Sequence, residues 1–253
     1  SVKRDNREKI AYNRIMAGIE LTTILWATLG GIVPTFLWLW FWLSEESHQN
    51  PAGLLILAYA IGMMSLFIIL PMKLFVESFP FKPVEILIIY VILEALIKLT
   101  TVAFITFRSK HLTDPIDYTI YLVTGALGFS GLENTFYLIQ PILDQNVSGT
   151  LLTGNLRFLG ATVLHTVTAG IVGIMLGSAF YSGKFIKSIH FILGIIFAIV
   201  LHSVFNYLIM LEIPRMTYLA LAGIWFVAVI VIILFERLKS LQNYLHNNSY
   251  EQS

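Results

Sequence analysis

The chain has 253 residues, of which 57% are hydrophobic and only 12% are charged, and its formal net charge is +1. Soluble domains carry about 25% charged residues, and a soluble fold of this size cannot bury so much apolar surface, so the composition indicates a protein with the bilayer as its solvent. The small net charge argues against a nucleic-acid partner. The absence of cysteine excludes disulfides, thiolate catalysis and cysteine metal sites.

The chain begins with a basic stretch and continues as a series of long apolar runs. We interpret residues 1–20 as a basic interfacial segment. Each run that follows approaches the roughly 20 residues that a membrane-spanning helix needs. The seven runs are 21–43, 54–72, 84–107, 117–141, 151–180, 187–211 and 215–235. We therefore predict an all-α, polytopic transmembrane bundle of about 7–8 spans over residues 21–235, followed by a polar, frayed tail, 236–253.

The fourth and fifth spans are rich in small residues, which let helix backbones approach closely in lipid. They are Gly125, Gly128, Gly131, Gly160, Ala161, Ala169, Gly170, Gly173 and Gly177. Ordinary packing within the bundle explains such a stripe. A buried site would also require such close packing.

Loop charges predict the orientation of the later spans. Loops near 108–114 and 183–187 carry Lys and Arg, whereas those near 142–150 and 212–214 carry neither. Basic loops favour the cytoplasm. With seven spans, the basic segment 1–20 would lie on the other side, so an eighth crossing or a re-entrant segment is needed to remove the conflict.

Several spans contain ionisable or amide side chains. A charge near the bilayer centre costs at least about 2.5–3.5 kcal/mol on insertion scales and usually marks function. These residues are Glu94, Lys98, Glu133, Asn134, Arg157, His165, His202 and Asn206. Arg157 lies near a span start, where snorkelling to the interface also explains it.

Four of these side chains are predicted to lie in one layer of the membrane. Counted from the 142–150 loop, Glu94 lies about ten residues deep, Glu133 about eight, His165 about fourteen and His202 about nine, or roughly 12–21 Å at the helical rise. Taken singly, each has a structural explanation: an ion pair of Glu94 with Lys98, a packing histidine at 165, and an interhelical clamp at 202. Their common depth favours a functional site.

Two carboxylates and two histidines suit peptide hydrolysis in more than one way. A carboxylate withdrawn from bulk water can serve as general base, while His and Asn N–H groups can stabilise an oxyanion. Alternatively, Glu133, His165 and His202 could bind Zn²⁺ and leave a position for water. The strongest zinc signature, H-E-x-x-H, is absent.

Four segments together resemble the PrsW family of intramembrane proteases, distant relatives of the CAAX prenyl proteases. They are Glu94-Ala-Leu-Ile-Lys98, Gly128-Phe-Ser-Gly-Leu-Glu133-Asn134, Arg157 with His165, and His202-Ser-Val-Phe-Asn206. Each motif is weak alone, whereas the ordered set over residues 84–210 is fairly specific. The resemblance implies cleavage of single-pass membrane proteins, such as anti-sigma factors, in a prokaryotic cell membrane.

By motif position, the resemblance assigns a set of residues to the active centre and a smaller set to its support. The centre would contain Glu94, Glu133, His165, His202 and Asn206, and Lys98 and Asn134 would support it. The metal or glutamic nature of the mechanism stays open at this point.

One position departs from the family pattern. The first motif of the family is Glu-Glu-x-x-Lys, and the second glutamate is Ala95 here. Loss of this carboxylate could remove the general base or its partner, so we expect this chain to be inactive or weakened. Natural divergence or an engineered inactive form would explain Ala95, and we favour the second.

Two other functions compete with the protease. A proton-coupled secondary transporter would use intramembrane Glu, Lys and His, but no inverted repeat or pair of broken spans is evident. A catalytically silent receptor or scaffold of the same fold would bind transmembrane partners, and Ala95 favours it.

Overall fold

The computed structural model describes residues 21–45 and 50–250, with side chains as far as Leu241, and this part of the chain contains helices and no β-strand. The predicted interfacial segment 1–20 lies outside the described residues. The helices are α2 (Leu21–Ser44), α3 (Ala52–Glu77), α4 (Pro83–Thr106), α5 (Asp117–Leu143), α6 (Val147–Leu156), the π-helix η1 (Arg157–Ala161), α7 (Thr162–Ser178), α8 (Lys184–Met210) and α9 (Pro214–Tyr250).

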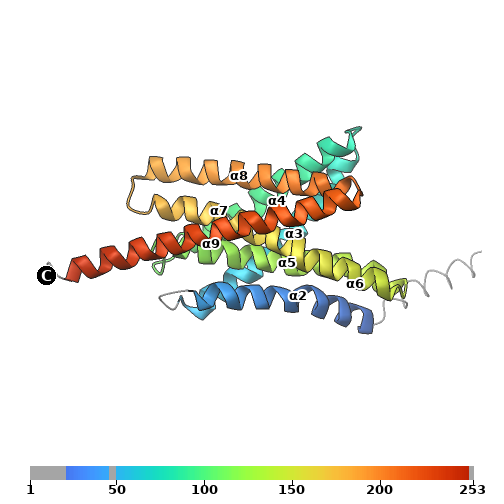
Figure 1. The fold of residues 1–253 in the computed structure, drawn as a ribbon, viewed down its shortest axis with the longest axis horizontal. Helices are drawn as coiled ribbons and strands as arrows, with labels where there is room; N and C mark the ends of the chain where they lie inside the picture. Colours follow the sequence, from blue (N-terminus) through green and yellow to red (C-terminus); the bar gives the residue numbers. More distant parts are fainter. Residues whose placement is uncertain (1–20, 46–49, 251–253) are drawn as a thin grey trace, which may run out of the picture.

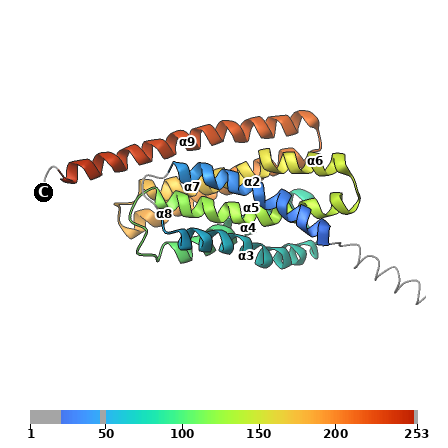
Figure 2. The same cartoon turned by 90° about the horizontal axis from the view of Figure 1, so that it is seen from below.

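These helices form seven long rods that run alternately up and down (Figures 1 and 2). The number is seven because α6, η1 and α7 follow one another as one continuous rod. Six of the rods are long and apolar enough to cross a membrane. The predicted all-α, polytopic bundle is therefore confirmed, and the chain is a multi-pass integral membrane protein. The remaining rod, α5, is the least apolar of the long helices preceding α9.

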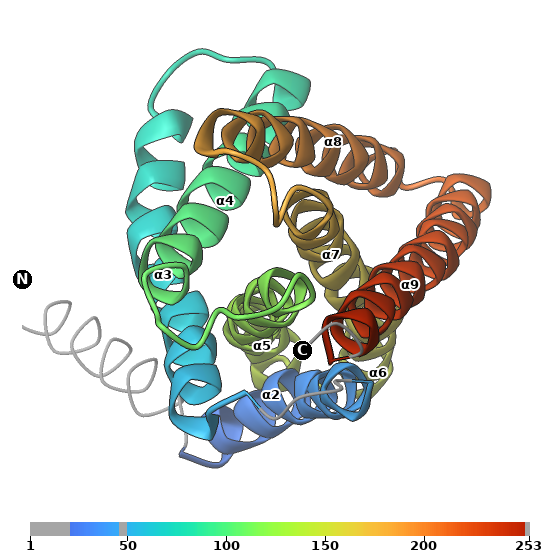
Figure 3. The same ribbon diagram turned by 90° about the vertical axis from the view of Figure 1, so that its left-hand side faces the viewer.

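The central position of α5 explains its composition. Figure 3 shows it inside the ring of the other helices, and every residue from Asp117 to Gly131 is buried. It packs mainly against α2, α3 and α7. Because α5 contacts protein rather than lipid, it can carry threonines, a glutamate and an asparagine that a lipid-facing helix would expose at a high cost.

Glycine allows α3 and α5 to cross at backbone contact. A Cβ atom on Gly62 would lie 1.8 Å from the carbonyl oxygen of Gly125, and one on Gly128 would lie 2.0 Å from the carbonyl oxygen of Tyr59. The Tyr59 hydroxyl is also 2.7 Å from Thr35 Oγ1 on α2. The close approach predicted from the small residues is thus confirmed, and it fixes the helix that carries Glu133.

We expect Gly128→Ala to destabilise the protein by about 1–3 kcal/mol or more, because the added methyl group meets a backbone carbonyl that cannot move independently. Gly223→Ala is the matched control, since nothing lies within 4 Å of a Cβ there, and removing a helical glycine normally stabilises by about 0.5–1 kcal/mol. Thermal unfolding in detergent measures both. A Gly128→Ala variant as stable as Gly223→Ala would contradict this packing.

The C-terminal tail differs from the prediction. It was expected to be frayed after Glu236, but α9 continues to Tyr250. Leu238 on this stretch is buried, and Lys239 forms an ion pair with Glu45 just after α2 at 3.3 Å. The prediction failed because polar composition alone does not reveal that one face of a helix packs on a neighbour.

The bundle has two ends that differ in charge. The loops 107–116 and 179–183 lie at one end together with the C-terminal part of α9, as Figure 1 shows, and we call this the basic end because Arg108, Lys110 and Lys184 gather there. The loops 78–82, 144–146 and 211–213 lie at the other, which we call the opposite end.

Candidate active site

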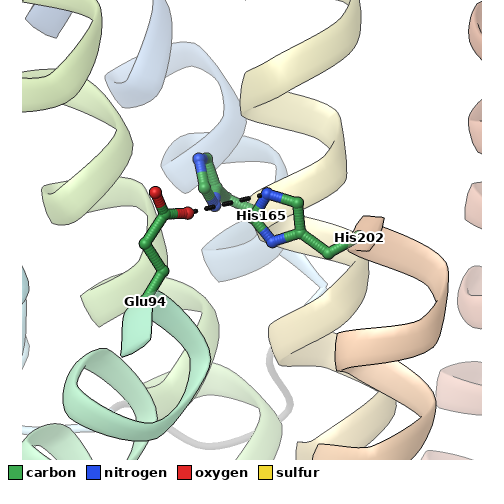
Figure 4. Close-up of side chains that lie close together, drawn as sticks. All are labelled: Glu94, His165 and His202. Atoms are coloured by element: carbon green, nitrogen blue, oxygen red, sulfur yellow. Dashed lines mark ion pairs between the residues drawn. The ribbon is translucent and has the colours of Figure 1, made fainter. Parts of the chain in front are cut away.

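Three of the predicted site residues point toward one another inside the bundle. Glu94 on α4, His165 on α7 and His202 on α8 are buried, and one ligand atom from each lies within 4.8 Å of the others (Figure 4). The nearest atoms of Glu94 and His202, Oε2 and Nε2, are 3.6 Å apart. The predicted common layer is therefore present in the structure.

The lengths of the helices explain this meeting. Glu94 lies about 16 Å from the start of α4 at Pro83, and His202 lies about 12 Å from the end of α8 at Met210. Both of these termini are at the opposite end of the bundle, and α4 and α8 are neighbours. Two antiparallel helices with similar distances from one end bring these side chains to the same depth.

Glu94 is paired with a residue that the sequence reasoning did not assign to the site. Lys73 of α3 forms an ion pair with Glu94 Oε1. The prediction ended this span at residue 72 and left Lys73 in a loop, but α3 continues through Pro71 to Glu77. The apolar Leu74, Phe75 and Val76 were the available signal that the helix extends. The expected pair of Glu94 with Lys98 is absent among the ion pairs of the described residues.

Glu133 is held from two directions. Arg157 donates from Nη2 to Glu133 Oε2, and His165 Nε2 lies 3.2 Å from the same oxygen. The Arg157 Nε–H donates to Asn134 Oδ1, and Asn134 Nδ2 donates to Thr162 at 2.9 Å. The sequence left snorkelling open as one explanation for Arg157, whereas the side chain turns inward and pairs with the carboxylate.

A local break in the α-helix directs Arg157 inward. Arg157 opens η1, where the Thr162 N–H bonds to the Arg157 carbonyl in the i→i+5 pattern. Such π-turns occur frequently at functional sites. The Leu159 carbonyl accepts a hydrogen bond from Trp225 Nε1 on α9 at 2.9 Å. The turn is thus stabilised by a neighbouring helix, which the 3.6-residue periodicity of the sequence could not reveal.

Lys98 and Ala95 lie behind the pocket. Lys98 Nζ is 3.0 Å from His165 Nδ1 and 4.8 Å from the centre of the Phe129 ring. Phe129 also packs edge-on against His165. Ala95 is buried in the apolar core and does not line the cavity of the site. The second position of the first motif therefore lies next to Lys98 rather than next to the space that a substrate would enter.

A cavity of about 420 Å³ gives access to these groups. Its deep part is lined by Glu94, Glu133, His165 and His202, and Asn206 lies further along the same α8 face. Pro83, Leu156 and Met210 line the part close to the opposite end of the bundle. The predicted sharing of one helix face by His202 and Asn206 is confirmed.

The donor atoms fit a divalent cation. One carboxylate oxygen and two imidazole nitrogens are a ligand set found in catalytic zinc sites, and they are close enough to share one ion. The predicted set was Glu133, His165 and His202, whereas the clustered group contains Glu94 in place of Glu133. Both carboxylates are ion-paired, Glu133 with Arg157 and Glu94 with Lys73, and the Glu94 carboxylate is the one that clusters with both histidines.

The charges of the site do not balance. Lys73, Lys98 and Arg157 are three cations, whereas Glu94 and Glu133 are two carboxylates. Each carboxylate pairs with one cation, Glu94 with Lys73 and Glu133 with Arg157. No carboxylate of the described residues forms an ion pair with Lys98. A third carboxylate at position 95 would restore equal numbers.

Comparison with known proteins agrees with this geometry. A family model described as PrsW family intramembrane metalloprotease matches residues 50–235. Protease PrsW of Shouchella clausii (strain KSM-K16) is 27% identical over 155 residues, which is 58% of this chain and 68% of that protein. Protease PrsW of Halalkalibacterium halodurans is 24% identical over 174 residues, or 68% of this chain and 77% of that protein.

A third relative covers a shorter stretch. Protease PrsW of Clostridioides difficile (strain 630) is 28% identical over 106 residues, which is 42% of this chain and 43% of that protein. No solved structure matches the chain. The relatives are bacterial, in agreement with the predicted prokaryotic membrane.

Proposed function

Because the chain belongs to the PrsW family of intramembrane metalloproteases, we propose that it is an endopeptidase that hydrolyses peptide bonds of single-pass membrane proteins within the bilayer. The observation that carries the proposal is the meeting of Glu94, Glu133, His165 and His202, from four different helices, around one cavity. Burying so many ionisable groups in a membrane is costly, and a reaction that needs them explains the cost.

Glu94, His165 and His202 are the proposed ligands of a divalent cation, with Zn²⁺ the expected metal. Such a cation supplies Lewis-acid polarisation of the scissile carbonyl and activation of the attacking water. Arg157 and Lys73 keep the two carboxylates fixed for these tasks. The proposed roles thus divide between Glu94 as ligand and Glu133 as acid–base residue.

Glu133 is the proposed general base. Its carboxylate lines the cavity next to His165, and Arg157 restricts its orientation. It accepts a proton from the water that adds to the peptide carbonyl, and it then donates that proton to the departing amine nitrogen as the C–N bond breaks. Asn206 lines the same cavity and can donate an amide hydrogen bond to the developing oxyanion.

The direction in which the cavity opens supports a proposal for the side of the membrane at which cleavage occurs. The cavity extends toward the opposite end of the bundle, which carries two basic residues in or beside its loops 78–82, 144–146 and 211–213, Lys82 and Arg215. The basic end carries Arg108, Lys110 and Lys184 in or beside its loops and fits the cytoplasm. We therefore propose cleavage near the non-cytoplasmic side, in substrates of the anti-sigma-factor type that the family resemblance implies.

The test is cleavage by the purified Ala95→Glu variant in liposomes, with single-pass reporters, including an anti-sigma factor, tagged at both ends. Two fragments are expected, with the cut near the non-cytoplasmic side by mass spectrometry. A chelator should abolish cleavage, and added Zn²⁺ should restore it, since a metal-independent glutamic mechanism would not respond. Intact reporters throughout the panel, with a folded variant, would count against the protease.

Ala95 also favours a second function, a catalytically silent receptor of the same fold. In that case a reporter should copurify with both the chain and its Ala95→Glu variant without being cut. The same reporters therefore distinguish the two functions.

A further inference from the structure

Lys98 occupies an unusual place for a buried cation. Its side chain is 1% exposed, its ammonium lies 3.0 Å from His165 Nδ1, and it forms no ion pair with any carboxylate of the described residues. Glu94, which lies one turn earlier on α4, does not pair with Lys98 because its partners are Lys73 and His202. The histidine nitrogen is therefore the side-chain hydrogen-bond partner that the structure gives to Lys98.

This contact fixes the hydrogen positions on His165. An ammonium group has three donors and no acceptor, so His165 Nδ1 must accept. A neutral imidazole with an accepting Nδ1 carries its hydrogen on Nε2. That nitrogen lies 3.2 Å from Glu133 Oε2, which accepts the hydrogen bond. Both nitrogens of His165 are then occupied, and neither offers a lone pair to a cation.

Ligation of a cation requires a different arrangement. If Nε2 binds a metal, Nδ1 carries the hydrogen and donates it to an acceptor, usually a carboxylate or a carbonyl. The Lys98 ammonium, 3.0 Å away, is also a donor, so two hydrogens would then point at each other. One of the two groups must move before His165 can become a ligand.

We propose that Lys98 competes with the divalent cation for His165, and that it does so in this chain because position 95 is alanine. The inference rests on the proposed function, since it concerns the same ligands. Residues 95 and 98 are three apart on α4 and share a helix face. A glutamate at 95, as in the family motif, would attract the ammonium of Lys98 and release His165. Ala95 thus disables the site through Lys98, a positioning residue.

The test is Co²⁺ binding by the purified full chain and three variants in detergent, followed by the visible absorption of bound Co²⁺. We expect Lys98→Met and Ala95→Glu to bind at least about 10-fold more tightly than the chain itself, the size of effect seen for groups that orient ligands. Lys98→Arg, the conservative variant, keeps a donor next to His165 and should remain as weak as the chain.

A second measurement examines His165 without metal. Nitrogen-15 NMR of labelled histidines, assigned with His165→Gln, should show hydrogen on Nε2 in the chain and a change of tautomer in Ala95→Glu. Suppose that the chain, Lys98→Met and Ala95→Glu all bind Co²⁺ with equal affinity and show the same His165 tautomer. That result would overturn the proposed competition by Lys98 but leave the proposed metal site intact. Absence of binding in every folded variant would overturn both the competition and the proposed metal site.

Discussion

Replacing Ala95 with glutamate is expected to raise the rate of reporter cleavage by about 10–100-fold, the range that a missing ligand-orienting group accounts for. The added carboxylate would balance the three cations of the site and draw Lys98 away from His165. Because Ala95 lies in the core and does not line the cavity, the gain would come from the organisation of the site rather than from contact with substrate.

Ala95→Gln is the matched control for this prediction. It has the size of glutamate without its charge, so it brings the same packing cost, about 1–3 kcal/mol for an enlarged core side chain, but cannot pair with Lys98. We expect it to cleave no faster than the chain itself. Equal initial rates for the chain, Ala95→Glu and Ala95→Gln would show that residue 95 does not limit cleavage.

Most of the fold followed from the sequence because the bilayer imposes a minimum length on each apolar helix. The seven predicted runs correspond to the seven rods. The common depth of Glu94, Glu133, His165 and His202 followed from the same argument, since antiparallel helices of equal length convert residue counts into depth. Depth alone, however, does not determine the direction in which a side chain points around its helix.

That missing information explains the differences within the site. Glu94 and Glu133 lie at similar depth, so counting could not tell which carboxylate joins the histidines and which one binds Arg157. Lys73 was missed because the predicted span ends at residue 72, whereas α3 continues to Glu77. The inward course of Arg157 depends on the π-turn, which Trp225 supports from 66 residues away.

Glu133 and Glu94 have different partners, so neutralising each one should have a different effect on cleavage and on metal binding. In the Ala95→Glu variant, Glu133→Gln should lower cleavage by about 10²–10⁴-fold, because an amide cannot accept a proton from water. Its Co²⁺ affinity should fall by no more than about 10–100-fold, since Glu133 contacts a ligand but is not part of the clustered group. Cleavage rates and Co²⁺ titration of the same preparation provide both numbers.

Glu94→Gln is the matched comparison, because the substitution and the burial are the same while the proposed role differs. It should lose cleavage and Co²⁺ binding together, since the amide oxygen is a poor replacement for a carboxylate ligand. If Glu133→Gln instead loses the metal and Glu94→Gln keeps it, Glu133 is the ligand that the sequence first indicated. The proton acceptor must then be sought at Glu94, with Lys73 rather than Arg157 as the residue that holds it.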